Sequence, residues 1–299
     1  MKSDVVYTSV RSRRFDEDNI PLIINLAPRK ICSMDCVYCY GGPTHIKTLR
    51  IDEKITFPLK YVKDEILKMF KFHSKNRTPI TYIAFSGLTE PTMYPFFNDV
   101  VDYFFELKEK YFLNIPTAIY SNGAMLDKRK IMEGIKKFDR SIIKLDAGDE
   151  ETFQRINKPV PNISLEKIVK NLIGIENIEI TTIVIDNQYG NYNSIKSDSY
   201  IEKINMIKPK LIWIGDADCT IPTDGMFYKL IRVPYKRLVE LADFISQNTG
   251  IEVNVFKQAT SPGVHPHYRY LSEKWKSQSL SSSKALMNSL PPISGMHMT

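Results

Sequence analysis

Short apolar runs alternate with amphipathic segments along most of this sequence. The runs are typical of buried strands, and we expect strands at residues 20–26, 80–85, 117–120, 141–145, 178–185, 211–214 and 251–256. Apolar residues recur with helical spacing between the runs, which predicts helices near residues 61–75, 96–110, 127–138, 150–156, 164–175, 200–207 and 235–247. Strands that alternate with helices in this way form a parallel sheet.

The number of strand–helix units indicates the fold class. About six or seven units are too few for the closed barrel of eight, so we predict an α/β fold, an open partial TIM barrel over residues 20–256. Residues 1–19 are mostly polar and are expected to form a short N-terminal arm. From residue 257 to residue 299 the alternation stops, and serine-rich and proline-containing stretches predict an irregular C-terminal extension.

Composition places the chain among soluble globular proteins, with 43% hydrophobic and 25% charged residues in a length of 299. The apolar runs are far shorter than the ~20 residues that cross a bilayer. The N-terminus also lacks the apolar core of a signal peptide. Four cysteines, three of them clustered, do not resemble a secreted disulfide framework. We therefore expect a cytoplasmic protein without a membrane partner, while the sequence leaves the oligomeric state open.

The charge balance bears on possible partners. A formal net charge of +7 is compatible with binding a polyanion, although lysine-rich surfaces also serve solubility. Arg11, Arg13 and Arg14 lie close together in the expected arm. They fit either a solvated segment or a phosphate contact.

The candidate chemistry is concentrated in one loop. Cys32, Cys36 and Cys39 fall within eight positions directly after the first expected strand, where a barrel presents its active site. Thiolates suit zinc or iron–sulfur clusters. A structural zinc site usually closes with four ligands, and the sequence has no second cysteine pair. Three thiolates leave a position open, which favours catalysis over a structural zinc loop or buried free thiols.

Polar residues also stand where the expected strands end. After the second, third, fourth and sixth strands the candidates are Gly87, Thr89, Glu90, Ser121, Asn122, Asp146, Asp216 and Cys219. A glycine loop with exposed carbonyls or a carboxylate can hold the ammonium group of an amino-acid ligand. Alternatively, Glu90 caps the next helix and Asn122 belongs to an Asn–Gly turn. For Cys219 we consider a buried inert thiol, a hydrogen-atom donor or substrate contact, and a ligand of a second metal.

The CxxxCxxC spacing, with Tyr38 before the third cysteine, resembles the radical SAM superfamily. The resemblance implies an open (β/α)6 barrel in which Cys32, Cys36 and Cys39 hold three irons of a 4Fe-4S cluster. The fourth iron would bind the amino and carboxylate groups of S-adenosylmethionine. Reduction by an external one-electron reductant would then release a 5′-deoxyadenosyl radical, which abstracts hydrogen from a substrate.

The same resemblance assigns roles to the strand-end residues. Contacts to S-adenosylmethionine are expected from Tyr38, Gly87, Thr89, Glu90, Ser121, Asn122 and Asp146. Asp216 and Cys219, at the expected barrel mouth, are the candidate catalytic residues facing the substrate.

Longer segments resemble the wyosine-forming enzymes, which build a tricyclic base on tRNA. They are Gly87–Pro95, Lys144–Pro159, Leu211–Cys219 and Arg232–Tyr235. The chain departs from that branch because no cysteine precedes Cys32, no lysine occurs in residues 10–15, and Thr89 replaces a family glycine. The second iron–sulfur cluster and the pyruvate-binding lysine of that branch are therefore not expected, which argues against carbon–carbon assembly from pyruvate.

These observations predict a radical SAM enzyme that modifies a tRNA base of the wyosine-related type. One alternative is radical modification of a peptide or small molecule by a diverged relative. A second, of a different class, is a non-enzymatic metal-cluster protein that binds nucleic acid.

Overall fold

The computed structural model describes residues 3–8, 20–39, 41–187, 189–217 and 233–256. All of them belong to the first of two compact units, Met1–Ser261. Residues 9–19 of the predicted arm, the predicted extension at 257–299, and Cys219 lie outside the described residues. The predicted domain boundaries therefore stay predictions.

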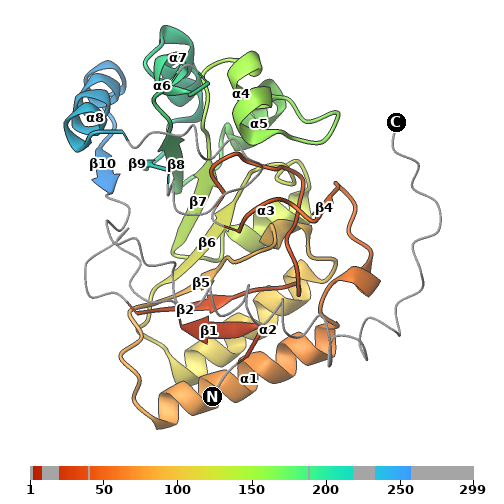
Figure 1. Ribbon diagram of the computed structural model, residues 1–299. Coiled ribbons are helices and arrows are strands. Elements are labelled where there is room, and N and C mark those ends of the chain that lie inside the picture. Colours follow the sequence, from red (N-terminus) through yellow and green to blue (C-terminus); the bar gives the residue numbers. More distant parts are fainter. Residues whose placement is uncertain (1–2, 9–19, 40, 188, 218–232, 257–299) are drawn as a thin grey trace. The chain divides into compact units, whose positions relative to one another are not determined.

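One eight-stranded sheet organises this unit, with the strand order β1-β2-β5-β6-β7-β8-β9-β10 (Figure 1). From β2 onward every neighbouring pair is parallel, as the alternation of strands and helices predicted. No pairing between β1 and β10 closes the sheet among the described residues. The bounds are Val6–Thr8 (β1), Pro21–Ile24 (β2), Tyr82–Phe85 (β5), Thr117–Ser121 (β6), Arg140–Lys144 (β7), Ile178–Val184 (β8), Leu211–Asp216 (β9) and Val253–Phe256 (β10). The prediction of an open partial barrel is confirmed.

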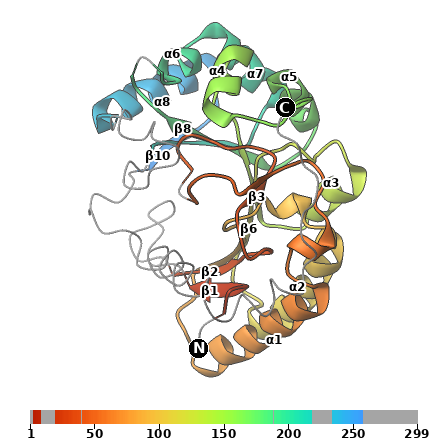
Figure 2. The ribbon, with the colours of Figure 1, turned by 45° about the vertical axis from the view of Figure 1, so that its right-hand side comes forward.

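Seven of the eight α-helices in the described ranges correspond to the predicted ones, and these helices lie along the outer side of the curved sheet (Figure 2). They are α1 (Leu59–Lys75), α2 (Phe97–Tyr111), α3 (Arg129–Ile135), α4 (Glu150–Asn157), α5 (Leu165–Leu172), α7 (Asp198–Ile207) and α8 (Tyr235–Thr249). Three begin with side-chain caps: Asp149 accepts a hydrogen bond from the Thr152 amide, Ser164 from the Lys167 amide, and Ser197 from the Tyr200 amide.

The main core lies between the sheet and these helices. Alternate strand residues such as Ile83 and Phe85 face this layer, while Tyr82 and Ala84 belong to a smaller cluster on the opposite face. Phe85 and Phe104 meet edge to face with ring centroids 5.1 Å apart. The strands are buried on both faces, as parallel strands covered by helices normally are.

The structure adds elements that the hydrophobic pattern did not predict. β3 (Ile31–Cys32) and β4 (Ile46–Lys47) form a small parallel pair around the cysteine loop. The other additions are α6 (Tyr192–Ile195) and two 3-10 turns, η1 (Glu53–Ile55) and η2 (Pro91–Met93). All are too short to produce a periodic sequence signal.

The start of the chain is a correction to the predicted arm. Val5 and Val6 are fully buried, and β1 pairs antiparallel with β2 at the sheet edge. Two adjacent valines and a tyrosine supply apolar surface that a solvated arm would leave in water.

No helix in the described ranges is both long and apolar enough to cross a membrane. The cytoplasmic location stays a prediction.

Candidate active site

The cysteine loop lies beyond the carboxyl end of β2 and is held against the end of α4. The amides of Asp35 and Val37 donate to the carbonyls of Asn157 (3.0 Å) and Ile156 (2.9 Å). An isolated antiparallel bridge joins Met34 to Pro159. Because these bonds fix the loop backbone between Cys32 and Cys39, its conformation depends on a segment more than a hundred residues away in sequence.

The three thiols of this loop are free and partly buried. Burial raises the pKa of Cys32, and it raises the pKa of Cys36 to about 11. Two side-chain amides donate toward the sulfurs: Asn122 Nδ2 lies 3.4 Å from Cys32 Sγ, and Asn157 Nδ2 lies 3.4 Å from Cys36 Sγ. Thiolates at these positions need positive charge nearby, such as metal ions supply.

Lys30 places one positive charge inside the loop. Its side chain is only 3% exposed, its Nζ donates to the Gly42 carbonyl, and Nζ lies 3.6 Å from an Asp35 carboxylate oxygen. Burial lowers the pKa of Lys30, but the charges of the Cys39, Cys36 and Cys32 thiolates together raise it above its ordinary value. The lysine is therefore a cation at the cysteine loop.

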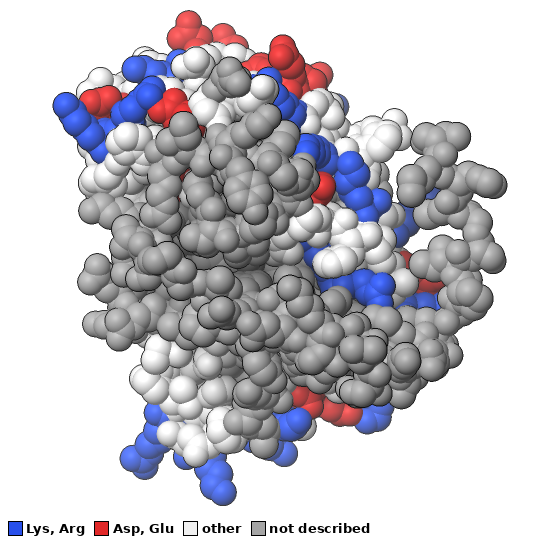
Figure 3. Space-filling view, in the orientation of Figure 1, with Lys and Arg blue, Asp and Glu red and all other residues white. Residues whose placement is uncertain are grey.

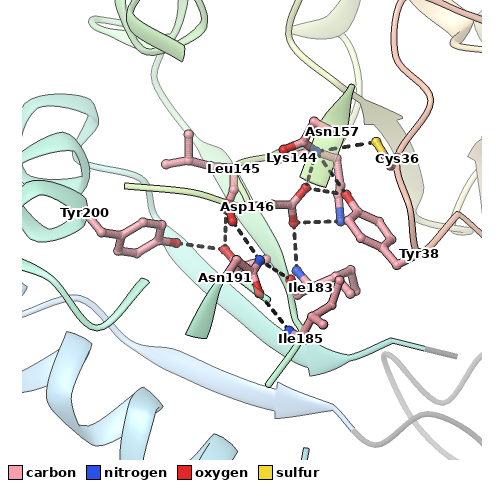
Figure 4. Close-up of polar contacts among 11 residues, drawn as sticks. Cys36, Tyr38, Lys144, Leu145, Asp146, Asn157, Ile183, Ile185, Asn191 and Tyr200 are labelled. Carbon is pink, nitrogen blue, oxygen red and sulfur yellow. Dashed lines mark hydrogen bonds and ion pairs between the residues drawn. The ribbon is translucent and has the colours of Figure 1, made fainter. Parts of the chain in front are cut away.

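Asp146, at the end of β7, anchors the loop from the other side (Figure 4). Its Oδ2 accepts hydrogen bonds from the Tyr38 hydroxyl and from Asn157 Nδ2 (2.8 Å), and its Oδ1 accepts from the Ile183 amide (2.8 Å). Lys144 Nζ lies 3.2 Å from Oδ1 and 4.5 Å from the centre of the Tyr38 ring. The Asp146 carboxylate is thus bound by protein groups and holds the Tyr38 hydroxyl, while its contact with S-adenosylmethionine stays a prediction.

Asn191 holds the backbone of Asp146 and of the end of β8. Its Nδ2 donates to the backbone carbonyls of Asp146 and Ile183, both at 2.7 Å, and its Oδ1 accepts from the Ile185 amide at 2.7 Å (Figure 4). Burial raises the pKa of Tyr38 well above its ordinary value, so Tyr38 stays a neutral donor to Asp146.

Glu90 anchors the loop after β5. Its buried carboxylate accepts from the Thr92 hydroxyl (2.6 Å) and amide (3.3 Å), the Ser121 hydroxyl (2.8 Å) and the Asn122 amide (2.8 Å). Burial raises the pKa of Glu90, although these hydrogen bonds oppose the rise. Glu90 is the N-cap of η2, which confirms the alternative of a capping residue; contact with an ammonium group stays a prediction.

Gly87 and Thr89 shape the backbone of the same loop. Gly87 has a φ of 122°, and a Cβ there would lie 2.8 Å from Asn25 Oδ1, so only glycine fits. The Thr89 hydroxyl donates to the Arg29 carbonyl at 3.1 Å. Both predicted residues therefore fix the loop after β5 against the segment that leads into the cysteines.

Asn122 joins the two halves of the site. Its Nδ2 donates to Ser33 Oγ (3.0 Å) as well as toward Cys32, while its Oδ1 accepts from the Ala124 amide (3.0 Å), forming the expected Asn–Gly turn. The cysteine loop and the ends of β5 and β6 thus form one hydrogen-bonded network, which the end of β7 joins through Asp146 and Tyr38.

The end of β9 packs close to this network. Asp216 is buried there, beside Val184 in the sheet register. The next residue, Ala217, belongs to a small apolar cluster with Val37 and Tyr38 of the cysteine loop. The roles predicted for Asp216 and Cys219 stay predictions.

Sequence reasoning missed several polar residues of the site, namely Asn25, Lys30, Asn157 and Asn191. Asn25 stands directly after β2, so its position alone could have drawn attention to it. Asn157 is the last residue of α4, and its Oδ1 is buried with no hydrogen-bond partner among the described residues. Asn157 lies within Lys144–Pro159, the segment that resembles the wyosine-forming enzymes, but that resemblance did not single it out.

The three cysteines and their neighbours distinguish between the two kinds of metal site that the sequence left open, a zinc site and an iron–sulfur cluster. Among the described residues, no three His, Cys, Asp or Glu side chains lie close enough to hold a single metal ion. That arrangement differs from a closed tetrahedral zinc site. In an iron–sulfur cluster each thiolate binds a different iron, so its cysteines stand further apart. Three free thiols on one loop, two amide donors to sulfur and an acceptor atom without a partner fit such a cluster with a bound ligand.

The family model of the Radical SAM superfamily matches residues 27–190, which contain the cysteine loop and the ends of β5, β6 and β7. The chain belongs to the radical SAM superfamily. It is accordingly an iron–sulfur enzyme that uses a 4Fe-4S cluster and S-adenosylmethionine. The non-enzymatic alternative is set aside by this membership.

Curated relatives match most of this chain but have longer sequences of their own. A protein called GTPase Obg from Brachyspira hyodysenteriae is 31% identical over 220 residues, 73% of this chain and 30% of that protein. A UPF0026 protein from Methanocaldococcus jannaschii is 29% identical over 209 residues, 67% of this chain and 60% of that protein. The chain therefore spans less than two thirds of the length of these relatives.

Solved radical SAM structures share the fold at low identity. A radical SAM methyltransferase from Sphaerobacter thermophilus has a TM-score of 0.58 at 11% identity, covering 84% of this chain and 69% of that one. SuiB from Streptococcus suis bound to S-adenosylmethionine has a TM-score of 0.55 at 14% identity, covering 82% of this chain and 52% of that one. TYW1 with a lysine-pyruvate adduct bound has a TM-score of 0.52 at 19% identity, covering 76% of this chain and 74% of that one.

Proposed function

We propose that this radical SAM enzyme modifies a base of tRNA, in a reaction related to wyosine formation. The supporting observation is that Lys144–Pro159, which resembles the wyosine-forming enzymes, is built into the site. Asp146 of this segment accepts from Tyr38, and Asn157 donates toward Cys36. The structural similarity to TYW1 supports only the fold. The choice of tRNA as substrate rests on the sequence segments that resemble the wyosine-forming enzymes and on the positive net charge of the chain.

Cys32, Cys36 and Cys39 hold the cluster in this proposal, and the loops after β5 and β6 line the place of S-adenosylmethionine. When bound and reduced, the cluster and S-adenosylmethionine supply a 5′-deoxyadenosyl radical, with the electron coming from an external one-electron reductant. Asn122 and Asn157 donate N–H groups toward the cysteine sulfurs. Gly87 lets the loop backbone come close to Asn25, and the unpartnered Asn157 Oδ1 would be the acceptor for a donor group of the bound ligand.

Basic residues near the site supply the attraction for a nucleic acid. Lys47, Arg50 and Lys54 are exposed in the segment that follows the cysteine loop, where Asp52 and Glu53 are exposed as well. Figure 3 shows more Lys and Arg than Asp and Glu right of centre, where Figure 1 places β4. Positive charge beside a site raises the affinity for phosphate backbones without selecting a sequence.

The test is turnover by anaerobically reconstituted protein with S-adenosylmethionine, dithionite and total tRNA from a strain that lacks this gene. We expect 5′-deoxyadenosine together with a nucleoside of changed mass after digestion of the tRNA. Cys36→Ala, which lacks one cluster ligand, should yield neither product.

A parallel reaction replaces tRNA by a peptide fraction or by small metabolites from the same strain. A changed mass confined to one of these, with tRNA unaltered, would contradict the tRNA proposal in favour of the peptide or small-molecule alternative.

A further inference from the structure

Lys30 is a buried cation whose position the reaction scheme above does not use. Its side chain is 3% exposed and stands two residues before Cys32. A Cβ built on Gly41 would lie 3.5 Å from Lys30 Cδ and 3.7 Å from Cys39 Sγ, so the lysine stem and the third thiol flank the same glycine. The ammonium group is thus held at the face of the loop that carries the cysteines.

The hydrogen bonds of Lys30 do not by themselves require a charge. The Gly42 carbonyl needs only a neutral N–H donor, which glutamine could provide. Burying an ammonium is costly unless opposite charge compensates it. Asp35 compensates it only in part, because this carboxylate lies 3.6 Å away, is 26% exposed and also accepts from the Thr44 amide at 2.7 Å. The lysine stem and Cys39 Sγ flank the same glycine, so the negative charge of the thiolates is available to compensate the rest.

A 4Fe-4S cluster on three thiolates carries net negative charge, and one electron from a reductant makes it more negative. A fixed positive charge beside it therefore stabilises the reduced form more than the oxidised form. We propose that Lys30 is the counter-charge of the cluster and that the Lys30–Asp35 pair sets its reduction potential. The inference rests on the proposed cluster ligands, and it makes Lys30 a positioning charge that takes no part in bond breaking.

Two charge changes of opposite sign test this proposal. Lys30→Gln removes the positive charge but keeps an N–H donor for Gly42. Asp35→Asn removes the negative charge but keeps an oxygen acceptor for the Thr44 amide. Lys30→Arg conserves the charge, and Lys60→Gln makes the same charge change as Lys30→Gln at a side chain that is 87% exposed. Each protein is reconstituted, assayed for iron and sulfide, and titrated with dithionite while the reduced cluster is followed by electron paramagnetic resonance.

We expect Lys30→Gln to lower the equilibrium constant for reduction of the cluster about tenfold. For a one-electron couple this is a shift of the reduction potential by about 59 mV toward more negative values. Asp35→Asn should shift it in the opposite direction, while Lys30→Arg and Lys60→Gln stay at the value of the unaltered protein. Exposed charges are screened by solvent, which is why Lys60 serves as the control.

A fully loaded Lys30→Gln protein with unaltered potential would overturn the proposal. If this variant does not load, an unaltered potential in Asp35→Asn overturns it equally. A loaded Lys30→Arg protein that shifts as far as Lys30→Gln would assign the effect to geometry. No substrate is added, so the result is independent of whether tRNA is modified, and failure of the unaltered protein to hold a cluster would instead refute the cluster ligands.

Discussion

Single buried polar side chains connect the loops of this site. Asn122 and Asn157 each donate toward a cysteine sulfur, and both also bind a second polar group that fixes their orientation. Hydrogen bonds to sulfur lower the energy of the thiolate form and tune iron–sulfur clusters. The two amides therefore support the loop and the cluster at the same time.

Asn157→Ala should lower the free energy of unfolding by about 1–3 kcal/mol, because it leaves the buried Asp146 carboxylate without one donor. It should also weaken binding of S-adenosylmethionine about tenfold through loss of the free Oδ1 acceptor. Urea unfolding and equilibrium titration of the reconstituted protein measure the two effects.

Asn248→Ala is the matched control, since Asn248 Nδ2 makes an exposed bond to the Phe244 carbonyl. If Asn157→Ala unfolded and bound the cofactor like Asn248→Ala, Asn157 would have no part in the site.

At the scale of elements, the site is made of strand ends held together by backbone contacts. The cysteine loop is bonded to the end of α4, and the loop after β5 is fixed to the end of β6 through Glu90. The close approach of Gly87 to Asn25 belongs to the same arrangement. The loops of the site are therefore tied to one another by these contacts.

Gly87→Ala should cost about 1–3 kcal/mol from its left-handed backbone alone, and more because its Cβ would meet Asn25 at 2.8 Å. Thermal or urea unfolding measures the loss.

Gly174→Ala separates these two causes. Gly174 has a φ of 80° with nothing within 4 Å of the added Cβ, so it reports the backbone cost without a clash. Equal losses in the two variants would show that the contact with Asn25 does not restrict the loop.

At the scale of the whole described unit, the sheet extends further toward the N-terminus than the polar composition suggested. β1 pairs with β2 in register Val6↔Ile24 and adds an antiparallel edge to the parallel strands. Asn25 ends β2 and binds both the segment before β1 and the loop after β5. The first strand of the chain therefore contributes to the frame on which the cysteine loop is built.

Val6→Asp should destabilise the unit strongly, by about 3 kcal/mol or more, because an unpaired charge would enter a fully buried position. Urea unfolding followed by circular dichroism measures this loss.

Thr8→Asp, at the less buried end of the same strand, should change the unfolding free energy much less. If Val6→Asp also unfolded like the unaltered protein, β1 would lie outside the cooperative core, as the original arm prediction implied.

The sequence by itself determined the seven parallel strands and the seven longer helices that alternate with them, because the spacing of apolar residues is a local property that survives in the fold. It also located the cysteine loop and the strand-end residues, since parallel strands place their carboxyl ends at one edge of the sheet. Gly87, Glu90, Asn122 and Asp146 were found in this way.

What those residues do was decided by tertiary structure. Asp146 meets Tyr38 across 108 positions of sequence, Asn122 meets Cys32 across 90, and Glu90 meets Ser121 across 31. Lys30 resembles any surface lysine in the sequence, and its burial beside Gly41, the Gly42 carbonyl and Asp35 appears only in the tertiary structure. Burial and hydrogen-bond partners arise from such distant contacts, so no local pattern contains them.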